Sequence, residues 1–368
     1  MFEHRPQTDK EVVELLSGIH EQGILLRCGG HASSRGVSPG KTQAILNLSD
    51  MNKITRLDPN DLTCGVQAGV LLEDLEEALA PHGLAFESGP FLGHRSIGGI
   101  LGEAPPASRS FDRGRLRSQL IGILGVDGRG RRFHAGGQVV KNVAGYDLCK
   151  LFVGSGGAYF VGLEFQLRLV ALPARIGLLQ SEPLGLDDGI IQWRELRNTL
   201  PTPRALDLVL EGSHCHIEVL LGGSAAYVES QIRHTGFKVK LEGMDAWKGV
   251  RGREAIANKE SSPPNLFRGH CPPSQLSDWI GQTPIHGRIH YQGAFEWDRL
   301  PGGERPMGAI VHPTQREGEQ VQGNPPSDPG ACRIAMELKR TFAGGLMPQR
   351  LSFLTRISRK GAPQEIHP

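Results

Sequence analysis

The stretch "GQVVKNVAGYDLCKLFVGSGG", residues 137–157, has the clearest local structural pattern in the chain. Asp147 stands where a helix can begin, because a carboxylate there can accept hydrogen bonds from the unpaired amides of the first turn. Gly154 is suited to end the same helix, since glycine adopts the left-handed conformation without strain. The apolar residues between them fall on one helical face: Leu148, Leu151 and Phe152. The stretch therefore predicts a short amphipathic helix between two glycine hinges.

Length and composition indicate an ordinary soluble protein of more than one domain. The chain has 368 residues, of which 38% are hydrophobic and 22% charged, as is typical of globular proteins. The net charge of +2 gives no general attraction for nucleic acid or an anionic membrane. No run approaches the roughly 20 apolar residues that cross a bilayer, and the first residues do not resemble a secretion signal. We therefore expect no transmembrane segment and a cytoplasmic location, with any membrane association made through partner subunits.

The cysteines are scattered and do not form a metal-binding pattern. They are Cys28, Cys64, Cys149, Cys215, Cys271 and Cys332. Because no CxxC pair occurs in the sequence, we expect no zinc, iron–sulfur or other metal site in this chain. Free thiols fit a reducing cytoplasm.

Hydrophobic periodicity predicts helices and short strands in the first half of the chain. Thr8 and Glu11 form a capping pattern before the first helix, and residues 127–130 form a hairpin turn. Helices are predicted over residues 8–20 and 71–82, and strands over 24–27, 44–48, 63–69, 120–126, 131–134 and 161–170. Residues 88–118, rich in glycine, proline and arginine, are predicted to form a loop.

Leu172 and Pro173 mark a predicted domain boundary. Beyond them, strands are predicted over residues 206–210, 215–221 and 238–241, helices over 223–234 and 331–342, and a long polar loop over 301–330. The expected fold is α+β. Its predicted divisions are one domain over residues 1–172, a cap-like substrate domain over 173–330, and a C-terminal helix and tail over 331–368.

Two glycine-rich segments are candidates for binding a ligand. "CGGHASSRG", residues 28–36, lies between two predicted strands, and "SIGG", residues 96–99, lies in the predicted loop. Glycine lets backbone amides approach a ligand closely and form a concave site for anionic oxygens, although a tight packed turn explains the same residues. The sequence contains neither the GxGxxG fingerprint of Rossmann domains nor a P-loop motif.

Together these segments resemble the PCMH-type FAD-binding domain of the vanillyl-alcohol-oxidase-like flavoproteins. "GGQVVKNVAGYDLCKLFVGSGG" is similar to the signature stretch of this family, "CGGHASSRG" to its pyrophosphate loop and "SIGG" to its second flavin loop. "LTCGVQAGVLLEDLEEALAPHGLAFES" resembles the strand and helix between them. The resemblance is strong over residues 20–172 and weaker through "DAWKGVRGREA" and "MELKRTFAGGLMPQR". Within the family, the chain is most similar to the FAD-binding E subunits of glycolate oxidase.

The resemblance implies two α+β subdomains that hold FAD between them, followed by an α+β cap-like domain and a C-terminal helix. The residues it places at the FAD pyrophosphate are Gly29, Gly30, His31, Ala32 and Ser33. The residues it places near the flavin or the adenine are Ile97, Gly98, Gly99 and Val161. Some members of the superfamily attach the flavin covalently to a histidine at the position of His31. The glycolate oxidase subunits hold FAD by contacts alone, and we expect the same here.

By the same resemblance, the chain is expected to be the FAD-binding subunit of a glycolate-oxidase-like complex. Such a complex oxidises a small 2-hydroxy acid by hydride transfer to flavin, and the expected partners are a larger FAD-binding subunit and an iron–sulfur subunit. Departures from the family pattern at Ser118, Ala158 and Phe160, and the acidic Glu103, leave an alternative open. This alternative is a non-catalytic assembly subunit with weakened or lost FAD binding. A third hypothesis is a stand-alone FAD-dependent alcohol oxidase.

The sequence does not assign a catalytic base. His290, in "GRIHYQGAF", is a candidate because histidine titrates near neutral pH, although a position facing solvent or a neighbouring strand is the favoured interpretation. Four arginines in one loop are candidates for binding the substrate carboxylate: Arg109, Arg113, Arg115 and Arg117. A solvated basic loop is the favoured interpretation of these arginines.

Overall fold

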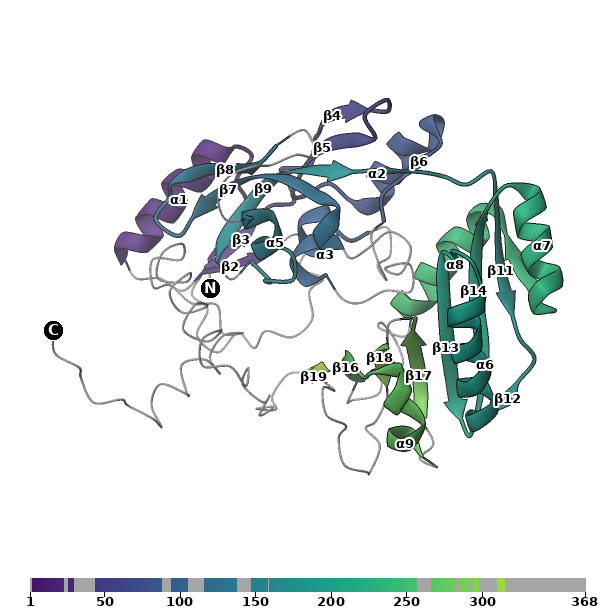
Figure 1. Ribbon diagram of the computed structural model, residues 1–368. Coiled ribbons are helices and arrows are strands. Elements are labelled where there is room, and N and C mark those ends of the chain that lie inside the picture. Colours follow the sequence, from purple (N-terminus) through teal and green to yellow (C-terminus); the bar gives the residue numbers. More distant parts are fainter. Residues whose placement is uncertain are drawn as a thin grey trace, which may run out of the picture.

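The computed structural model shows four β-sheets within the described residues, with helices packed against them (Figure 1). The described residues are 2–22, 26–29, 44–87, 94–104, 116–137, 147–157, 159–256, 266–281, 285–291, 293–297 and 310–314. The first part of the chain builds three small sheets, and the second part builds one nine-stranded sheet. The α+β fold expected from the sequence is confirmed.

The first sheet is parallel. Its strands are, in spatial order, β1 (Phe2–His4), β3 (Ala44–Asn47) and β2 (Leu26–Gly29). Helix α1 (Asp9–Gln22) begins where the capping pattern predicts: the Glu11 amide donates to Thr8 Oγ1 at 3.3 Å, and the Gln7 amide donates to the Glu11 carboxylate at 2.9 Å. The predicted first helix is therefore confirmed and extends two residues beyond its predicted end.

Five antiparallel strands form the central sheet of the first part. They are, in spatial order, β4 (Ile54–Asp58), β5 (Thr63–Gln67), β9 (Phe160–Arg168), β7 (Leu120–Asp127) and β8 (Arg132–Gly136). Strands β7 and β8 form the predicted hairpin. The carboxylate of Asp127 closes its turn by accepting hydrogen bonds from the amides of Arg129 and Arg131, both at 2.9 Å. Asp127 is 3% exposed, so the hairpin turn is held by a buried carboxylate.

The helices of the first part differ from prediction at two places. The helix predicted over residues 71–82 divides into α2 (Leu72–Leu79) and a 3-10 turn, η1 (Ala80–His82), because Pro81 has no amide hydrogen to continue the α-helical ladder. The predicted loop over residues 88–118 is wrong in part, since it contains α3 (Ile97–Glu103) and the short η2 (Leu116–Ser118). Local glycine content hid α3, which depends on contacts with distant residues.

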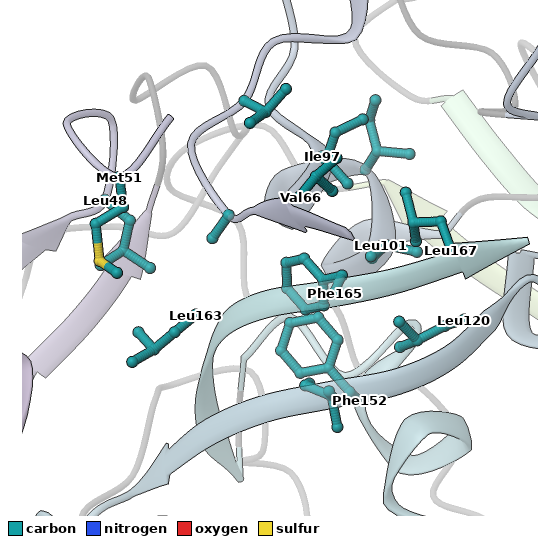
Figure 2. Packing of buried hydrophobic residues seen from close by; sticks show 14 of the residues in the cluster. Leu48, Met51, Val66, Ile97, Leu101, Leu120, Phe152, Leu163, Phe165 and Leu167 are labelled. Atoms are coloured by element: carbon teal, nitrogen blue, oxygen red, sulfur yellow. The ribbon is translucent and has the colours of Figure 1, made fainter. Parts of the chain in front are cut away.

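One hydrophobic core joins the elements of the first part (Figure 2). Phe165 of β9 packs against Phe152 of α5 (Leu148–Phe152), with ring centroids 5.2 Å apart. Figure 2 shows both rings beside Leu120 of β7. The buried residues Leu163, Phe165 and Leu167 alternate along β9 with the half-buried Glu164 and Gln166, which confirms the predicted half-buried strand.

The second part is an antiparallel nine-stranded sheet. Eight strands lie in the order β15 (Lys238–Glu242), β11 (Arg175–Gln180), β14 (His214–Gly223), β13 (Ala205–Gly212), β17 (Ile285–His290), β18 (Ala294–Trp297), β16 (Leu266–His270) and β19 (Ile310–Thr314). The ninth, β12 (Leu184–Gly185), pairs with β14. The three strands predicted in this part are confirmed as β13, β14 and β15. Strand β19 corrects the loop predicted over 301–330; the rest of that range and the helix predicted over 331–342 lie outside the described residues.

Helices pack on both faces of the nine-stranded sheet. Helices α6 (Leu186–Thr199), α7 (Ala225–Thr235) and α9 (Leu276–Ile280) share a core with one face. Helix α8 (Gly243–Ile256) covers part of the other face through the buried Ala246 and Trp247. The predicted helix over 223–234 is confirmed as α7, whereas α6 and α8 were not predicted. A 3-10 turn, η3 (Pro273–Gln275), precedes α9.

A small hydrophobic cluster joins the two parts. The first part contributes Ala85 of β6 (Leu84–Ala85) and Val170 of β10 (Val170–Ala171), two strands that pair with each other. The second part contributes Ile176, Leu178, Ala205, Leu220, Ala246 and Trp247. The main core of the first part ends at Leu169, and that of the second part begins at Leu179; the domain boundary at residues 172 and 173 stays a prediction. Among the described helices, none is both long and apolar enough to cross a membrane.

Candidate functional site

The predicted second flavin loop is the first turn of α3. Ser96 caps this helix, because its hydroxyl accepts a hydrogen bond from the Gly99 amide at 3.3 Å. The Gly98 amide donates to the carbonyl of Ala68 at 2.9 Å, and the Ile97 amide donates to the carbonyl of Val70 at 2.8 Å. The segment is therefore bonded, through its backbone, to the residues that follow β5.

Packing against the protein explains the glycine at position 98. A Cβ there would lie 2.9 Å from the Ala68 carbonyl oxygen, closer than real Cβ atoms approach. A Cβ at Gly99 would lie 3.1 Å from the Ser96 hydroxyl, and Ile97 is fully buried. Contact between these three residues and FAD stays a prediction.

The glycines that end the opening stretch contact α3. The Gly154 amide donates to the Leu101 carbonyl at 2.9 Å, and the Gly156 amide donates to the Gly102 carbonyl at 2.8 Å. Gly154, Gly156 and Gly157 have φ values of +81°, +62° and +73°, a conformation that favours glycine. These amides are therefore used to join the turn after α5 to α3, which accounts for the second glycine hinge.

Helix α5 forms as the sequence predicts. The Asp147 carboxylate accepts a hydrogen bond from the Lys150 amide at 3.0 Å, and the helix ends at Phe152, before Gly154. Cys149 on its inner side is buried, and burial raises the pKa of this thiol to about 12. Because the thiolate is the nucleophilic form, Cys149 is a packing residue.

Two departures from the family pattern are accommodated by packing. The Phe160 ring lies 4.9 Å from the Phe133 ring in an edge-to-face contact and 5.7 Å from the Phe152 ring in a stacked contact, measured between centroids. Glu103 forms an ion pair with Arg95 at 2.6 Å, so its charge is balanced within the protein. Ser118 is exposed at the end of η2, and Ala158 lies outside the described residues.

The predicted pyrophosphate loop begins at the carboxyl end of a parallel strand. Strand β2 is parallel to β3 and ends at Gly29, and ligands of open parallel sheets bind at such ends. A loop that starts with a residue lacking a side chain fits the close approach of a pyrophosphate. The rest of the loop lies outside the described residues: Gly30, His31, Ala32 and Ser33.

The other predicted contact residues have mixed outcomes. Val161 is 6% exposed and belongs to the core of the first part, and its contact with FAD stays a prediction. Arg117 donates to the Val153 carbonyl at 3.4 Å, so it contacts the end of α5. Arg109, Arg113 and Arg115 lie outside the described residues.

A second candidate site is a buried network of charged side chains on the nine-stranded sheet. Nη1 of Arg288 donates to the Asp207 carboxylate at 2.8 Å and to the Glu218 carboxylate at 2.9 Å. Nδ1 of His290 lies 3.0 Å from the other carboxylate oxygen of Asp207. Asp207, Glu218 and His290 are only 1%, 3% and 4% exposed. The solvent-facing position considered for His290 is therefore wrong, and its contact with a neighbouring strand is confirmed.

Strand alternation places this network on one face. In β13, β14 and β17, one set of alternate residues enters the apolar core under α6, α7 and α9, and the other set carries the charged groups. The sequences of these strands show the signal as polar residues that recur at alternate positions of apolar runs, with Val209 as an exception: "ALDLVLEG", "HCHIEVLLGG" and "IHGRIH". Sequence reasoning named His290 alone because the pairing of these strands was not known.

Comparison with known families agrees with the geometry of the first part. Residues 3–136 match the family described as FAD binding domain. This part of the chain is therefore an FAD-binding domain of the PCMH type, with FAD as its cofactor. The sequence is similar to those of FAD-linked oxidoreductases, among them glycolate oxidase subunits and D-lactate dehydrogenases.

Three curated relatives show the range of this group. Glycolate oxidase subunit GlcD of Bacillus subtilis is 32% identical over 171 residues, which cover 46% of this chain and 36% of that protein. The D-lactate dehydrogenase of Archaeoglobus fulgidus is 29% identical over 167 residues, which cover 45% and 38%. Glycolate oxidase subunit GlcE of Escherichia coli is 30% identical over 182 residues, which cover 46% and 52%. The chain thus spans little more than a third of the length of the first two relatives.

Solved structures share the fold of nearly the whole chain. An alkyldihydroxyacetonephosphate synthase superposes with a TM-score of 0.65 over 92% of this chain and 74% of that chain, at 13% sequence identity. A variant of Phl p 4, described as a glucose dehydrogenase, superposes with a TM-score of 0.60 over 83% of this chain and 72% of that chain, at 15% identity. These similarities establish the fold of both parts.

Proposed function

We propose that this chain is an FAD-binding subunit of a glycolate-oxidase-like complex that oxidises a small 2-hydroxy acid. The similarity to subunit GlcE is the observation that carries the proposal, because it covers about half of each protein. The similarities to GlcD and to a D-lactate dehydrogenase support the same substrate class. FAD, when bound, supplies the two-electron acceptor for the hydride of the substrate.

The proposed cofactor contacts follow from the three segments of the first part. Gly29, Gly30, His31, Ala32 and Ser33 bind the pyrophosphate through backbone amides and short side chains. Gly98 and Gly99 at the start of α3 lie at the flavin, as does the strand that contains Val161. His31 hydrogen-bonds to the phosphate and makes no covalent bond to the flavin.

The proposed partners are a larger FAD-binding subunit and an iron–sulfur subunit. The names of the relatives GlcD and GlcE, both glycolate oxidase subunits, support a complex of more than one chain. The sequence of this chain has no CxxC pair, which fits electron transfer onward through another subunit. The proposed location of the complex is the cytoplasm.

A non-catalytic assembly subunit is the second candidate, and two structural observations weaken it. The aromatic ring of Phe160 packs in the protein core, and Arg95 balances the charge of Glu103. These two replacements therefore have a structural explanation that does not require the loss of FAD. The replacement at Ala158 has no such explanation, so the assembly subunit stays the second candidate.

Anaerobic reduction of the purified protein distinguishes the three functions. Glycolate, D-lactate and L-lactate would be added in turn, with acetate as the matched acid that lacks a hydroxyl group. We expect the flavin absorption bands to bleach with at least one 2-hydroxy acid and to persist with acetate. A folded, colourless protein would instead indicate the assembly subunit, and reduction by simple alcohols alone would indicate the alcohol oxidase.

A further inference from the structure

The last turn of helix α6 carries an arginine that lies between two aromatic rings. The guanidinium carbon of Arg197 is 5.1 Å from the centroid of the Trp193 ring and 4.8 Å from that of the Tyr291 ring. Trp193 stands one turn earlier in the same helix and is fully buried, whereas Tyr291 directly follows β17, 94 residues further along the chain. Stacking on an aromatic face is favourable for a guanidinium, so two distant segments together hold this side chain.

Both rings are fixed by hydrogen bonds that do not involve the guanidinium. The Tyr291 hydroxyl donates to the carbonyl of Arg197 at 3.1 Å, and Nε1 of Trp193 donates to the carbonyl of Leu206 in β13 at 3.5 Å. The guanidinium plane is therefore held by packed groups before any ligand binds. A side chain that is already ordered loses less conformational entropy on binding, which favours Arg197 as a ligand-binding residue.

The N–H groups of Arg197 find no acceptor within the described part of the chain. Its Nε atom is buried and makes no hydrogen bond to a described residue, and none of the described carboxylates pairs with its guanidinium. Other partly buried arginines donate to carboxylates: Arg95 to Glu103 at 2.6 Å and Arg288 to Asp207 at 2.8 Å. A guanidinium has five N–H donors and no acceptor atom, so Arg197 has donors to offer an anion.

A second arginine adds positive charge beside Arg197. Arg194, one turn earlier on α6, donates through Nε and Nη2 to the backbone carbonyl of Pro273, at 2.9 and 2.5 Å. A carbonyl satisfies these donors but does not neutralise the charge. Burial lowers the pKa of the Arg197 guanidinium, and the nearby charge of Arg194 acts in the same direction. Because arginine stays ionised near neutral pH, the end of α6 presents two positive charges that neutral groups position.

The helix end accounts for the charge of Arg197 but not for its fixed orientation. A cation in the last turn interacts favourably with the partial negative charge of a helix C-terminus, and Arg233 occupies the last turn of α7 in the same way. Arg233 is exposed, whereas Arg197 is half-buried. The helix C-terminus therefore explains a positive charge at both positions, and Arg233 serves as a matched control.

The planar fork of a guanidinium suits one class of ligand. Two of its parallel N–H groups can donate to two oxygens of a carboxylate or a phosphate, and a stacked guanidinium keeps the plane that this requires. We propose that Arg197, with Arg194 beside it, forms a binding site for a small oxyanion, either a phosphate or a carboxylate. The site belongs to the second part of the chain and is independent of the proposed function and of FAD.

Side-chain NMR of the purified chain tests this site. The Nε–H signal of Arg197 would be identified by its loss in Arg197→Met. Sodium phosphate or sodium acetate would be added at constant ionic strength, because salt screens weak attraction between charges. We expect a saturable shift of the Arg197 signal with phosphate, with acetate or with both. A shift with phosphate alone would identify a phosphate ligand, and a shift with acetate alone would identify a carboxylate ligand.

Three variants separate a built site from a general attraction between charges. Tyr291→Leu removes one of the two rings and keeps both arginines, and it should raise the dissociation constant about threefold or more. Arg194→Met removes the neighbouring charge and should have a similar effect, whereas Arg233→Met should leave the constant unchanged. Circular dichroism would establish that each variant is folded. If Tyr291→Leu does not fold, Arg194→Met and Arg233→Met still make the comparison.

Three results would overturn the proposal. The first is the absence of a saturable shift of the Arg197 signal with both anions. The second is equal weakening by Arg194→Met and Arg233→Met, since the anion would then respond to the overall charge of the second part. The third is an unchanged dissociation constant in a folded Tyr291→Leu variant, because stacking would then not be what positions the guanidinium.

Discussion

The two parts of the chain hold their candidate sites together by different kinds of contact. In the FAD-binding part the decisive contacts join backbones, as between the Gly98 amide and the Ala68 carbonyl. On the nine-stranded sheet they join ionised side chains, with Arg288 between Asp207 and Glu218. The first part is therefore sensitive to added atoms at glycines such as Gly69 and Gly98, where a Cβ would collide with backbone carbonyl oxygens. The second is sensitive to lost charge, because a carboxylate left alone in the interior is costly.

The largest expected loss in the free energy of unfolding comes from replacing Arg288. Arg288→Met leaves two buried carboxylates without this guanidinium, and removing one partner of a buried ion pair costs about 4 kcal/mol. Arg175→Met is the matched control, because the partners of Arg175, Glu229 and Glu242, have side chains that are 51% and 62% exposed. Exposed pairs contribute less than about 1 kcal/mol. Urea unfolding of both variants measures the difference, and equal losses would contradict the account of the buried network.

An added methyl group in the first part should have the next largest effect. A Cβ at Gly69 would lie 2.2 Å from the Leu48 carbonyl oxygen and 2.8 Å from that of Met51. Gly69→Ala must therefore move backbone, and we expect a loss of about 3 kcal/mol in the free energy of unfolding. Gly177→Ala in β11 is the control from the second part, since its Cβ would meet only Val228 Cγ1, at 3.8 Å.

Thermal and urea unfolding of the two glycine variants would be compared directly. If Gly177→Ala destabilised the protein as much as Gly69→Ala does, close backbone approach would not be the cause of the loss at Gly69.

A variant in the β7–β8 hairpin of the FAD-binding part tests the role of the buried Asp127 carboxylate. Asp127→Ala removes the acceptor of the Arg129 and Arg131 amides, and we expect a loss of about 2 kcal/mol. Asp61→Ala should cost less than about 0.5 kcal/mol, because the Asp61 side chain is 67% exposed and lies 3.9 Å from its arginine partner. Denaturant midpoints of the two variants measure this difference, and a larger shift for Asp61→Ala would be evidence against the assigned role of the turn.

The smallest expected effect is a pH dependence of folding stability, to which buried thiols in both parts contribute. Burial raises the pKa of the Cys64 thiol to about 12 and that of the Cys215 thiol to about 11. A raised pKa in the folded state means that ionisation favours unfolding, so this stability is complete below the ordinary thiol pKa of about 8.5 and decreases as the pH rises above it. Alkylation at pH 8.5, followed by peptide mapping, should leave both thiols unlabelled until urea is added. Rapid labelling of either thiol in the folded protein would show that its burial is wrong.

Features that depend on neighbouring residues could be predicted from the sequence. The cap of α1 by Thr8, the cap of α5 by Asp147 and the hairpin turn at Asp127 each involve partners within four residues. Helix α6 was missed because it contains Gly189, which lowers helix propensity. The structure requires this glycine, since a Cβ there would lie 2.1 Å from Cys215 Sγ. The contact with Cys215 therefore requires glycine at a position where glycine lowers the local helix propensity.

The charged network could not be predicted for the same reason. Asp207 and His290 are 83 residues apart in the chain, and only the pairing of β13 with β17 brings them together. The alternation within each strand shows which residues share a face, but it does not show which strands are neighbours. The glycine segments were recognised through family resemblance, and their backbone partners in the protein became visible only in the structure.

The flavin content of the folded protein tests the central claim most directly. The purified chain would be precipitated with acid, and FAD would be measured in the supernatant and the pellet, for the unaltered chain and for Gly30→Val. We predict about one FAD for each unaltered chain, released entirely into the supernatant, and none bound to a folded Gly30→Val variant. A folded unaltered chain without flavin would contradict the account, as would a Gly30→Val variant that keeps a full complement of FAD.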